Sequence, residues 1–235
     1  MSSAAAGAPR SERAVIVPVG AVRLEGILAL PSGAAGVVLF AHGSGSGRFS
    51  PRNNFVARVL QEGGLGTLLI DLLEEREAQD RRNVFDIDLL ADRVLSATDW
   101  LLREPETSAL RIGHFGASTG AAAALQAAAR QLEAVGAIVS RGGRPDLATA
   151  YLAQVQAPTL LIVGGLDFTV LELNQDAYAL LSCEKDLVII PGATHLFEEP
   201  GTLEEVARLA RDWFLRYLPA GASSGGTSPP TPNVE

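Results

Sequence analysis

The sequence contains a single cysteine, Cys183, and therefore cannot form an intramolecular disulfide. Its first thirteen residues lack the continuous apolar segment of a secretory signal, and it has no apolar run of the roughly 18 residues that would cross a membrane. Basic residues are also in deficit, because 19 Lys and Arg are outnumbered by 27 Asp and Glu, for a net charge of −8. An acidic chain is poorly suited to neutralising phosphates. We therefore expect a cytoplasmic protein that binds neither nucleic acid nor membrane.

The 235 residues are enough for one large domain, and 47% of them are hydrophobic. Both ends of the chain are rich in small residues, proline and serine, without a hydrophobic period. Residues 1–13 and 219–235 are therefore predicted to be disordered. The remaining residues, 14–218, are predicted to form a single folded domain.

Short apolar runs rich in β-forming residues alternate with segments of helical period. The eight runs are Ala14–Val19, Leu24–Leu30, Gly36–Phe40, Thr67–Ile70, Leu110–Phe115, Ala137–Val139, Thr159–Val163 and Leu187–Ile190. From Gly36 onward they show little alternation, which is typical of strands covered on both faces. Helices with an apolar stripe are predicted to begin at Pro51, Ile87 and Thr202. The pattern predicts an α/β protein with a mostly parallel, eight-stranded sheet and helices on both faces.

Ligands bind such sheets at the carboxyl ends of the strands, so the residues after each run are the functional candidates. The fifth run leads into Gly116-Ala117-Ser118-Thr119-Gly120, a G-x-S-x-G pattern, and then into an alanine-rich segment that favours helix. A nucleophile on a sharp strand-to-helix turn needs neighbours without a Cβ, and the two glycines meet that need. The same pattern recurs at residues 221–225, with no strand run before it. Ser118 is therefore the predicted nucleophile.

A serine hydroxyl needs a base within hydrogen-bond reach, because it is almost wholly protonated on its own. His195 follows the last run on a loop, whereas His114 lies inside a run and is interpreted as structural. A carboxylate usually holds the second ring nitrogen of such a base, and Asp167 follows the seventh run. Glu198 and Glu199 are weaker candidates, because they lie so close to His195 in sequence.

The tetrahedral intermediate of acyl transfer carries negative charge on an oxygen, which two backbone N–H groups usually stabilise. Thr119 offers one N–H at a predicted helix N-terminus, and the glycine-rich segment after the third run offers the other, at Ser44. Residues 42–47 have alternative interpretations as a flexible loop or a phosphate cradle. They lack the G-K-[ST] of a P-loop and the G-x-G-x-x-G of a dinucleotide site.

With these motifs the sequence resembles the α/β-hydrolase superfamily, and its short body without a cap domain resembles the dienelactone hydrolase-like branch. The resemblance rests on residues 41–44, 115–120, 164–167 and 192–195 and covers about residues 14–218. It implies Ser118 as nucleophile, Asp167 as orienting carboxylate and His195 as general base and then acid. Dienelactone hydrolases proper use cysteine where this chain has Ser118, so dienelactone itself is not the expected substrate. Haloalkane dehalogenases and epoxide hydrolases are excluded, because they carry an aspartate at this turn.

Arginines are predicted to gather at the same sheet edge. They are Arg48, Arg52, Arg141 and Arg144. Arg48, Arg141 and Arg144 are candidates for recognising a carboxylate on the substrate, because a guanidinium group offers a fork of donors. Alternatively, these arginines pair with structural carboxylates, among them Asp71 and Asp146.

The residues thus predict a serine esterase that cleaves small carboxylic esters through an acyl-enzyme, without a metal or cofactor. An acyltransferase, a thioesterase or a small peptidase would use the same three residues. A non-catalytic α/β-hydrolase fold that binds a ligand is a further alternative. The mixed charges of residues 72–86 predict a solvated loop or a mobile flap over the site. The oligomeric state is left open.

Overall fold

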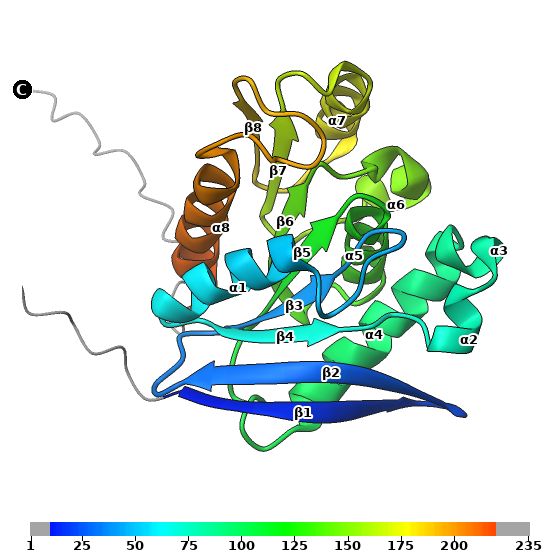
Figure 1. The fold of residues 1–235 in the computed structure, drawn as a ribbon, viewed down its shortest axis with the longest axis vertical. Coiled ribbons are helices and arrows are strands. Elements are labelled where there is room, and N and C mark those ends of the chain that lie inside the picture. The colour runs from blue at the N-terminus through cyan, green and yellow to red at the C-terminus, as the bar shows by residue number, and fades with distance from the viewer. Residues whose placement is uncertain (1–9, 220–235) are drawn as a thin grey trace, which may run out of the picture.

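An eight-stranded sheet forms the centre of the computed structural model, which describes residues 10–219 (Figure 1). The strand order is β1-β2-β4-β3-β5-β6-β7-β8. The strands are β1 (Arg10–Val19), β2 (Val22–Pro31), β3 (Val37–Ala41), β4 (Gly66–Ile70), β5 (Ile112–Ala117), β6 (Val135–Arg141), β7 (Thr159–Gly164) and β8 (Lys185–Ile190). The β1–β2 and β2–β4 pairs are antiparallel, whereas every pair from β4 to β8 is parallel. The predicted α/β fold with a mostly parallel sheet is confirmed.

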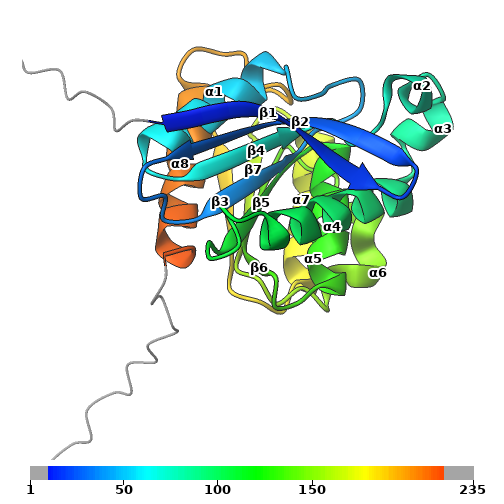
Figure 2. The same cartoon turned by 90° about the horizontal axis from the view of Figure 1, so that it is seen from below.

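Helices cover both faces of this sheet. They are α1 (Pro51–Glu62), α2 (Glu75–Ala78), α3 (Arg81–Val84), α4 (Ile87–Arg103), α5 (Thr119–Arg130), a 3-10 turn at Pro145–Ala148, α6 (Thr149–Leu152), α7 (Phe168–Leu180) and α8 (Thr202–Tyr217). One face packs against α1 and α8, and the other against α4 and α5 (Figure 2). The helices predicted to begin at Pro51, Ile87 and Thr202 are confirmed. Within residues 10–219, none of the helices is long and apolar enough to span a membrane.

The central strands explain the apolar runs in the sequence. Every residue of β3, β4, β5, β6 and β7 is buried, because helices cover both faces of the sheet there. At the start of α1, the Ser50 side chain accepts a hydrogen bond from the Asn53 N–H, and Pro51 occupies the first helical position. The Ser50 cap and Pro51 therefore fix the start of α1 directly after the glycine-rich loop that follows β3.

The first strand begins earlier than the sequence predicted. Residues 10–13 belong to β1, which pairs with β2 from Arg10↔Pro31 to Val19↔Val22. Arg13 also forms ion pairs with Glu104 (2.6 Å) and Glu106 (2.7 Å), beyond the end of α4. The prediction of disorder for residues 10–13 is thus wrong, because partners distant in the sequence order them. The other predicted disordered residues, apart from Pro219, lie outside the described part of the chain.

The order of the strands places a crevice at the ends of β3 and β5. From β3 the chain crosses to β4 through α1 on one face of the sheet, and from β5 it crosses to β6 through α5 on the other face. The loops that leave β3 and β5 therefore diverge to opposite faces, and such a switch point is where ligands bind in open α/β sheets. The predicted Ser44 and Ser118 lie on these two loops.

His114 lies on β5 below this crevice, with 1% of its surface exposed. Its Nε2 is 2.9 Å from the hydroxyl of Thr98 on α4, and that hydroxyl donates to the Val94 carbonyl. Burial lowers the pKa of His114 to about 4. The side chain is neutral at pH 7 and ties β5 to α4 rather than pointing toward the strand ends.

This pKa predicts acid sensitivity of the fold. Because the pKa in the folded state lies below the reference value of about 6.5, the unfolded chain takes up the proton first as the pH falls. The contribution of His114 is present above pH 6.5 and is lost toward pH 4. We expect the free energy of unfolding, measured in urea, to fall by about 1–2 kcal/mol between pH 7 and pH 5 on this account. The variant His114→Gln should lose this share of the pH dependence and should keep the share that is due to His42. An identical pH dependence in both proteins would contradict the assignment.

Candidate active site

Ser118 occupies the turn between β5 and α5 in a conformation that non-glycine residues rarely adopt. Its backbone angles are φ 51° and ψ −121°. The flanking glycines make room for this turn: a Cβ at Gly116 would lie 2.4 Å from Ala121 Cα, and one at Gly120 would lie 2.2 Å from the Ala41 carbonyl oxygen. The G-x-S-x-G pattern is thus required by the close approach of α5 to β5 and β3. The second occurrence of the pattern, at residues 221–225, lies outside the described residues.

Asp167 and His195 meet at the ends of β7 and β8. The distance between Asp167 Oδ2 and His195 Nδ1 is 2.6 Å, and the Asp167 side chain is more buried than that of His195. The contact depends on Gly164, because a Cβ there would lie 2.5 Å from the Ala193 carbonyl oxygen and 2.6 Å from that of Thr194. A carboxylate on Nδ1 keeps a proton on that nitrogen and leaves Nε2 able to accept one.

The segment after β6 connects Ser118 with His195. The Ser118 N–H donates to the Arg141 carbonyl (3.3 Å), and the Ser118 carbonyl accepts from the Arg144 N–H (3.1 Å). Gly142, between these two contacts, has φ 50°, and a Cβ there would lie 3.6 Å from His195 Cε1. The loops after β5, β6, β7 and β8 therefore converge, and they bring the three residues predicted from the sequence to one sheet edge.

The remaining histidine, His42, is fixed by backbone groups. Its Nδ1 is 2.9 Å from the Gly43 carbonyl, and its Nε2 is 2.9 Å from the Leu72 N–H. Because a carbonyl only accepts and an N–H only donates, Nδ1 must carry the proton and Nε2 must accept. Burial also lowers the pKa of His42. His42 thus holds the loop after β3 against the end of β4, and neither of its nitrogens is free to take a proton from a serine.

Ser44 and Thr119, the predicted oxyanion-binding pair, lie side by side. The Ser44 N–H donates to the Thr119 Oγ1 at 3.1 Å. Thr119 is the first residue of α5, where the N–H groups have no acceptor within the helix. The loop after β3 therefore presents a backbone donor next to the N-terminus of the helix that follows Ser118.

The two glutamates considered beside His195 have other partners. Glu199 accepts hydrogen bonds from the Thr194 N–H (3.1 Å) and hydroxyl (2.6 Å), while Glu198 forms an ion pair with Arg52 (3.1 Å). The sequence patterns did not predict this closure of the His195 loop. The available signal was the spacing of Thr194 and Glu199, which lie five residues apart on a loop that leads into a helix.

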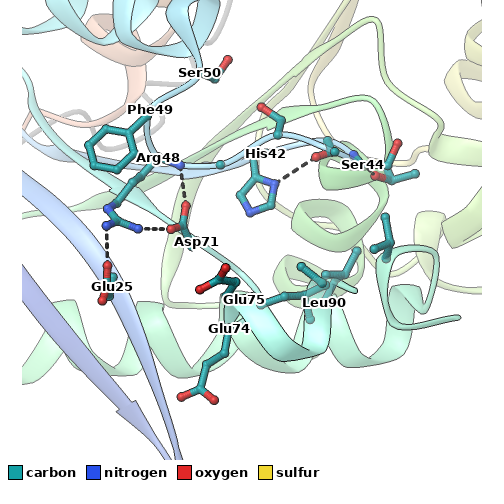
Figure 3. A pocket seen from close by; sticks show the side chains of 18 of the residues that line it. Glu25, His42, Ser44, Arg48, Phe49, Ser50, Asp71, Glu74, Glu75 and Leu90 are labelled. Atoms are coloured by element: carbon teal, nitrogen blue, oxygen red, sulfur yellow. Dashed lines mark hydrogen bonds and ion pairs between the residues drawn. The ribbon is translucent and has the colours of Figure 1, made fainter. Parts of the chain in front are cut away.

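Two of the three predicted substrate-binding arginines are engaged in ion pairs. Arg48 pairs with both Asp71 and Glu25 (Figure 3), and its backbone N–H also donates to Asp71. Arg144 forms a two-pronged pair with Asp146 at 2.8 and 2.7 Å. Arg48 and Arg144 therefore follow the alternative prediction, in which the arginines pair with structural carboxylates.

Arg141 differs from these two. Only 8% of its surface is exposed, and its Nε and Nη1 are buried without a hydrogen-bond partner among residues 10–219. Burial, together with the nearby positive charge of Arg52, lowers its pKa to about 10. Arg141 therefore stays charged at pH 7 in an environment that does not compensate its charge.

A cavity of about 1050 Å³ opens beside Ser44 and Thr119 (Figure 3). Residues 72–86, predicted to be a solvated loop or a flap, contain the short helices α2 and α3. Several of them line this cavity, as does the exposed ring of Phe49. Glu25, on β2, also lines the cavity, and no sequence pattern predicted this. Asp71 was predicted only as a partner of arginine, although its position directly after β4 marks it as a strand-end residue.

The chain is similar in sequence and structure to known proteins. The family described as "Dienelactone hydrolase family" matches residues 24–218. The crystal structure of dienelactone hydrolase from Anabaena variabilis is 59% identical, with a TM-score of 0.87 over 89% of this chain and 99% of that one. Est1E from Butyrivibrio proteoclasticus shares the fold, at 16% identity and a TM-score of 0.75 over 86% of this chain and 98% of that one.

A relative in Mycobacterium tuberculosis, named "Putative phosphoribosyl transferase", is 55% identical over 222 residues. The match covers 94% of this chain and 50% of that protein, so the chain spans about half the length of this relative. The family match over residues 24–218 and the near-complete correspondence with the Anabaena structure show that the chain belongs to the dienelactone hydrolase family.

Proposed function

We propose that this protein is a serine hydrolase that cleaves small carboxylic esters through an acyl-enzyme intermediate. The observation that carries the proposal is the 2.6 Å contact between Asp167 and His195, next to the strained turn that presents Ser118. The other two histidines support it by exclusion, because His42 and His114 are buried and hydrogen-bonded elsewhere. His195 is thus the histidine suited to act as a base.

The chemistry follows from these positions. His195 Nε2 takes the hydroxyl proton of Ser118 as the serine oxygen attacks the ester carbonyl carbon, and Asp167 stabilises the resulting imidazolium. The tetrahedral intermediate collapses when the bond to the leaving alcohol breaks and His195 returns the proton to that alcohol. A water molecule then attacks the acyl-enzyme by the same route, which releases the acid and restores Ser118.

The negative oxygen of the intermediate requires donors at the same edge. We assign this role to the backbone N–H groups of Ser44 and Thr119. The Thr119 hydroxyl, which accepts the Ser44 N–H in the free protein, has to yield that N–H to the oxyanion. One such donor contributes about 3 kcal/mol to stabilising the transition state.

The cavity beside Ser44 and Thr119 supports a small substrate. Its volume of about 1050 Å³ is close to the upper limit of about 1,000 Å³ that is usual for small-molecule sites, and it is lined by Ser44 and Thr119, not by Ser118 or His195 themselves. The phosphoribosyl transferase name belongs to a relative about twice the length of this chain, and neither that activity nor its substrate is part of the proposal.

The nucleophile is tested by variants at the two G-x-S-x-G patterns. Ser118→Ala should abolish labelling by a fluorophosphonate probe and lower kcat for 4-nitrophenyl acetate by about 10³-fold or more, and Asp167→Asn should lower kcat by a similar factor. Ser223→Ala, in the second pattern, is the matched control and should keep wild-type labelling and kcat. Labelling of the Ser118→Ala protein at the wild-type rate would refute the assignment.

The backbone strain at Ser118 predicts a separate effect on stability. Glycine adopts φ 51° without steric cost, whereas alanine retains the strain of the serine. We expect Ser118→Gly to exceed Ser118→Ala by about 1 kcal/mol in the free energy of unfolding, measured in urea at pH 7. If the alanine variant were equally stable or more stable, the turn would not be strained.

A further inference from the structure

Thr119 is the first residue of α5 and directly follows Ser118, the proposed nucleophile. Only 4% of its surface is exposed, and it lines the cavity together with Ser44. Its backbone N–H lies in the first turn of the helix, where no helical carbonyl is available as a partner. Its side chain adds a hydroxyl group at the same place. Thr119 therefore brings two polar groups to the position where the oxyanion would form.

The Ser44 N–H fixes the hydrogen-bond roles of the Thr119 hydroxyl. Because an N–H can only donate, Oγ1 must be the acceptor in their 3.1 Å contact. A hydroxyl group also carries one hydrogen of its own, and among residues 10–219 that hydrogen has no acceptor. The hydroxyl is thus left with one donor to offer to a bound molecule.

Buried threonines elsewhere in the fold use this hydrogen within the protein. Four of the five other buried threonines in residues 10–219 donate their hydroxyl hydrogen to a backbone carbonyl, and none of the four lines the cavity. They are Thr98, Thr107, Thr159 and Thr202. A buried donor without an acceptor is unusual in a folded protein. At Thr119 this unusual donor coincides with the candidate active site.

We propose that the Thr119 hydroxyl is a third donor to the oxyanion, beside the backbone N–H groups of Ser44 and Thr119. The inference rests on the proposed serine hydrolase function, and it makes the Thr119 side chain a catalytic group. In the free protein, the Ser44 N–H holds the hydroxyl oxygen in place and leaves the hydroxyl hydrogen available.

The spacing of the two groups allows one oxygen atom to contact both. Ser44 N and Thr119 Oγ1 are 3.1 Å apart, and N–H and O–H donors approach an acceptor to about 2.9 and 2.7 Å. As negative charge develops on the substrate oxygen, the Ser44 N–H exchanges the neutral hydroxyl for a charged acceptor, and the hydroxyl changes from acceptor to donor. Hydrogen bonds to an ionised acceptor are about twice as strong as neutral ones. The exchange therefore favours the transition state over the free enzyme.

Substitutions of the side chain test the hydroxyl. Thr119→Val replaces it with a methyl group and should lower kcat/KM for 4-nitrophenyl acetate by about 10²-fold, mainly through kcat, because the donor acts on the charge of the intermediate. Thr119→Ala should show the same loss without a steric contact to Ser44, whereas Thr119→Ser should retain most of the activity. An unchanged or higher kcat in both Thr119→Val and Thr119→Ala would overturn the proposal, since the hydroxyl would then only compete for the Ser44 N–H.

Thr98→Val is the matched control, because it removes another buried threonine hydroxyl. That hydroxyl contacts His114 Nε2 and donates to the Val94 carbonyl, away from the cavity. The variant should have a lower Tm, since His114 loses a buried hydrogen-bond partner, and should keep the wild-type kcat/KM. If Thr98→Val lost as much activity as Thr119→Val, the loss would reflect a loosened fold and would count against the third donor.

A crystal structure of the Ser118 adduct with a fluorophosphonate separates this inference from the proposed function. The phosphoryl oxygen takes the place of the oxyanion, so Thr119 Oγ1 should lie about 2.5–3.0 Å from it. An adduct in which Oγ1 still accepts from the Ser44 N–H and lies more than about 3.5 Å from the phosphoryl oxygen would overturn the third donor and leave the nucleophile established. If no adduct formed at Ser118, the proposed function itself would fail, and the third donor with it.

The same adduct of Thr119→Val tests for an indirect effect through the loop after β3. The Ser44 N–H should still donate to the phosphoryl oxygen, because the variant removes only the hydroxyl. A Ser44 N–H displaced from that oxygen would assign the lost activity to movement of the loop, and would overturn the proposal.

Discussion

The close approach of backbone segments at the turn around Ser118 is the constraint on which the rest of the site depends. A strand must become a helix within one residue while α5 lies against both β5 and β3, and only glycine at positions 116 and 120 leaves the space. The cost of the left-handed serine is met by the buried packing on either side, since α5 and β5 are buried almost throughout. The close approach of α5 to β3 also brings Thr119 next to Ser44. The same packing therefore positions both Ser118 and the N–H donors beside it.

The three histidines show how environment assigns different roles to one residue type. His114 and His42 are buried, with lowered pKa values and partners that fix their neutral form. His195 is more than one third exposed at the side chain and has a carboxylate on Nδ1. Burial therefore turns two of the imidazoles into structural elements, one linking β5 to α4 and one linking the loop after β3 to β4, while the third remains accessible at the sheet edge.

The arginines divide in the same way, by whether a carboxylate lies within reach. Arg48 joins the loop after β3 to β2 and to the end of β4, and Arg144 stabilises the turn after β6. Arg141 is enclosed, and no carboxylate among residues 10–219 pairs with it, which is costly for a buried charge. At this edge of the sheet, the arginines therefore differ in whether a carboxylate of the described residues balances their charge.

The sequence by itself determined the sheet and the turn. Runs without alternation predicted the buried parallel strands, and the glycines around Ser118 predicted the sharp turn, because both signals depend on residues adjacent in the chain. It also indicated Asp167 and His195, because carboxyl ends of parallel strands meet at one edge. Only the tertiary structure decided that residues 10–13 extend β1, that Glu199 bonds Thr194 instead of His195, and that Arg48, unlike Arg141, has a carboxylate partner among the described residues. These outcomes depend on which side chains from distant segments come within a few ångströms of one another, and local sequence patterns carry no information about such distances.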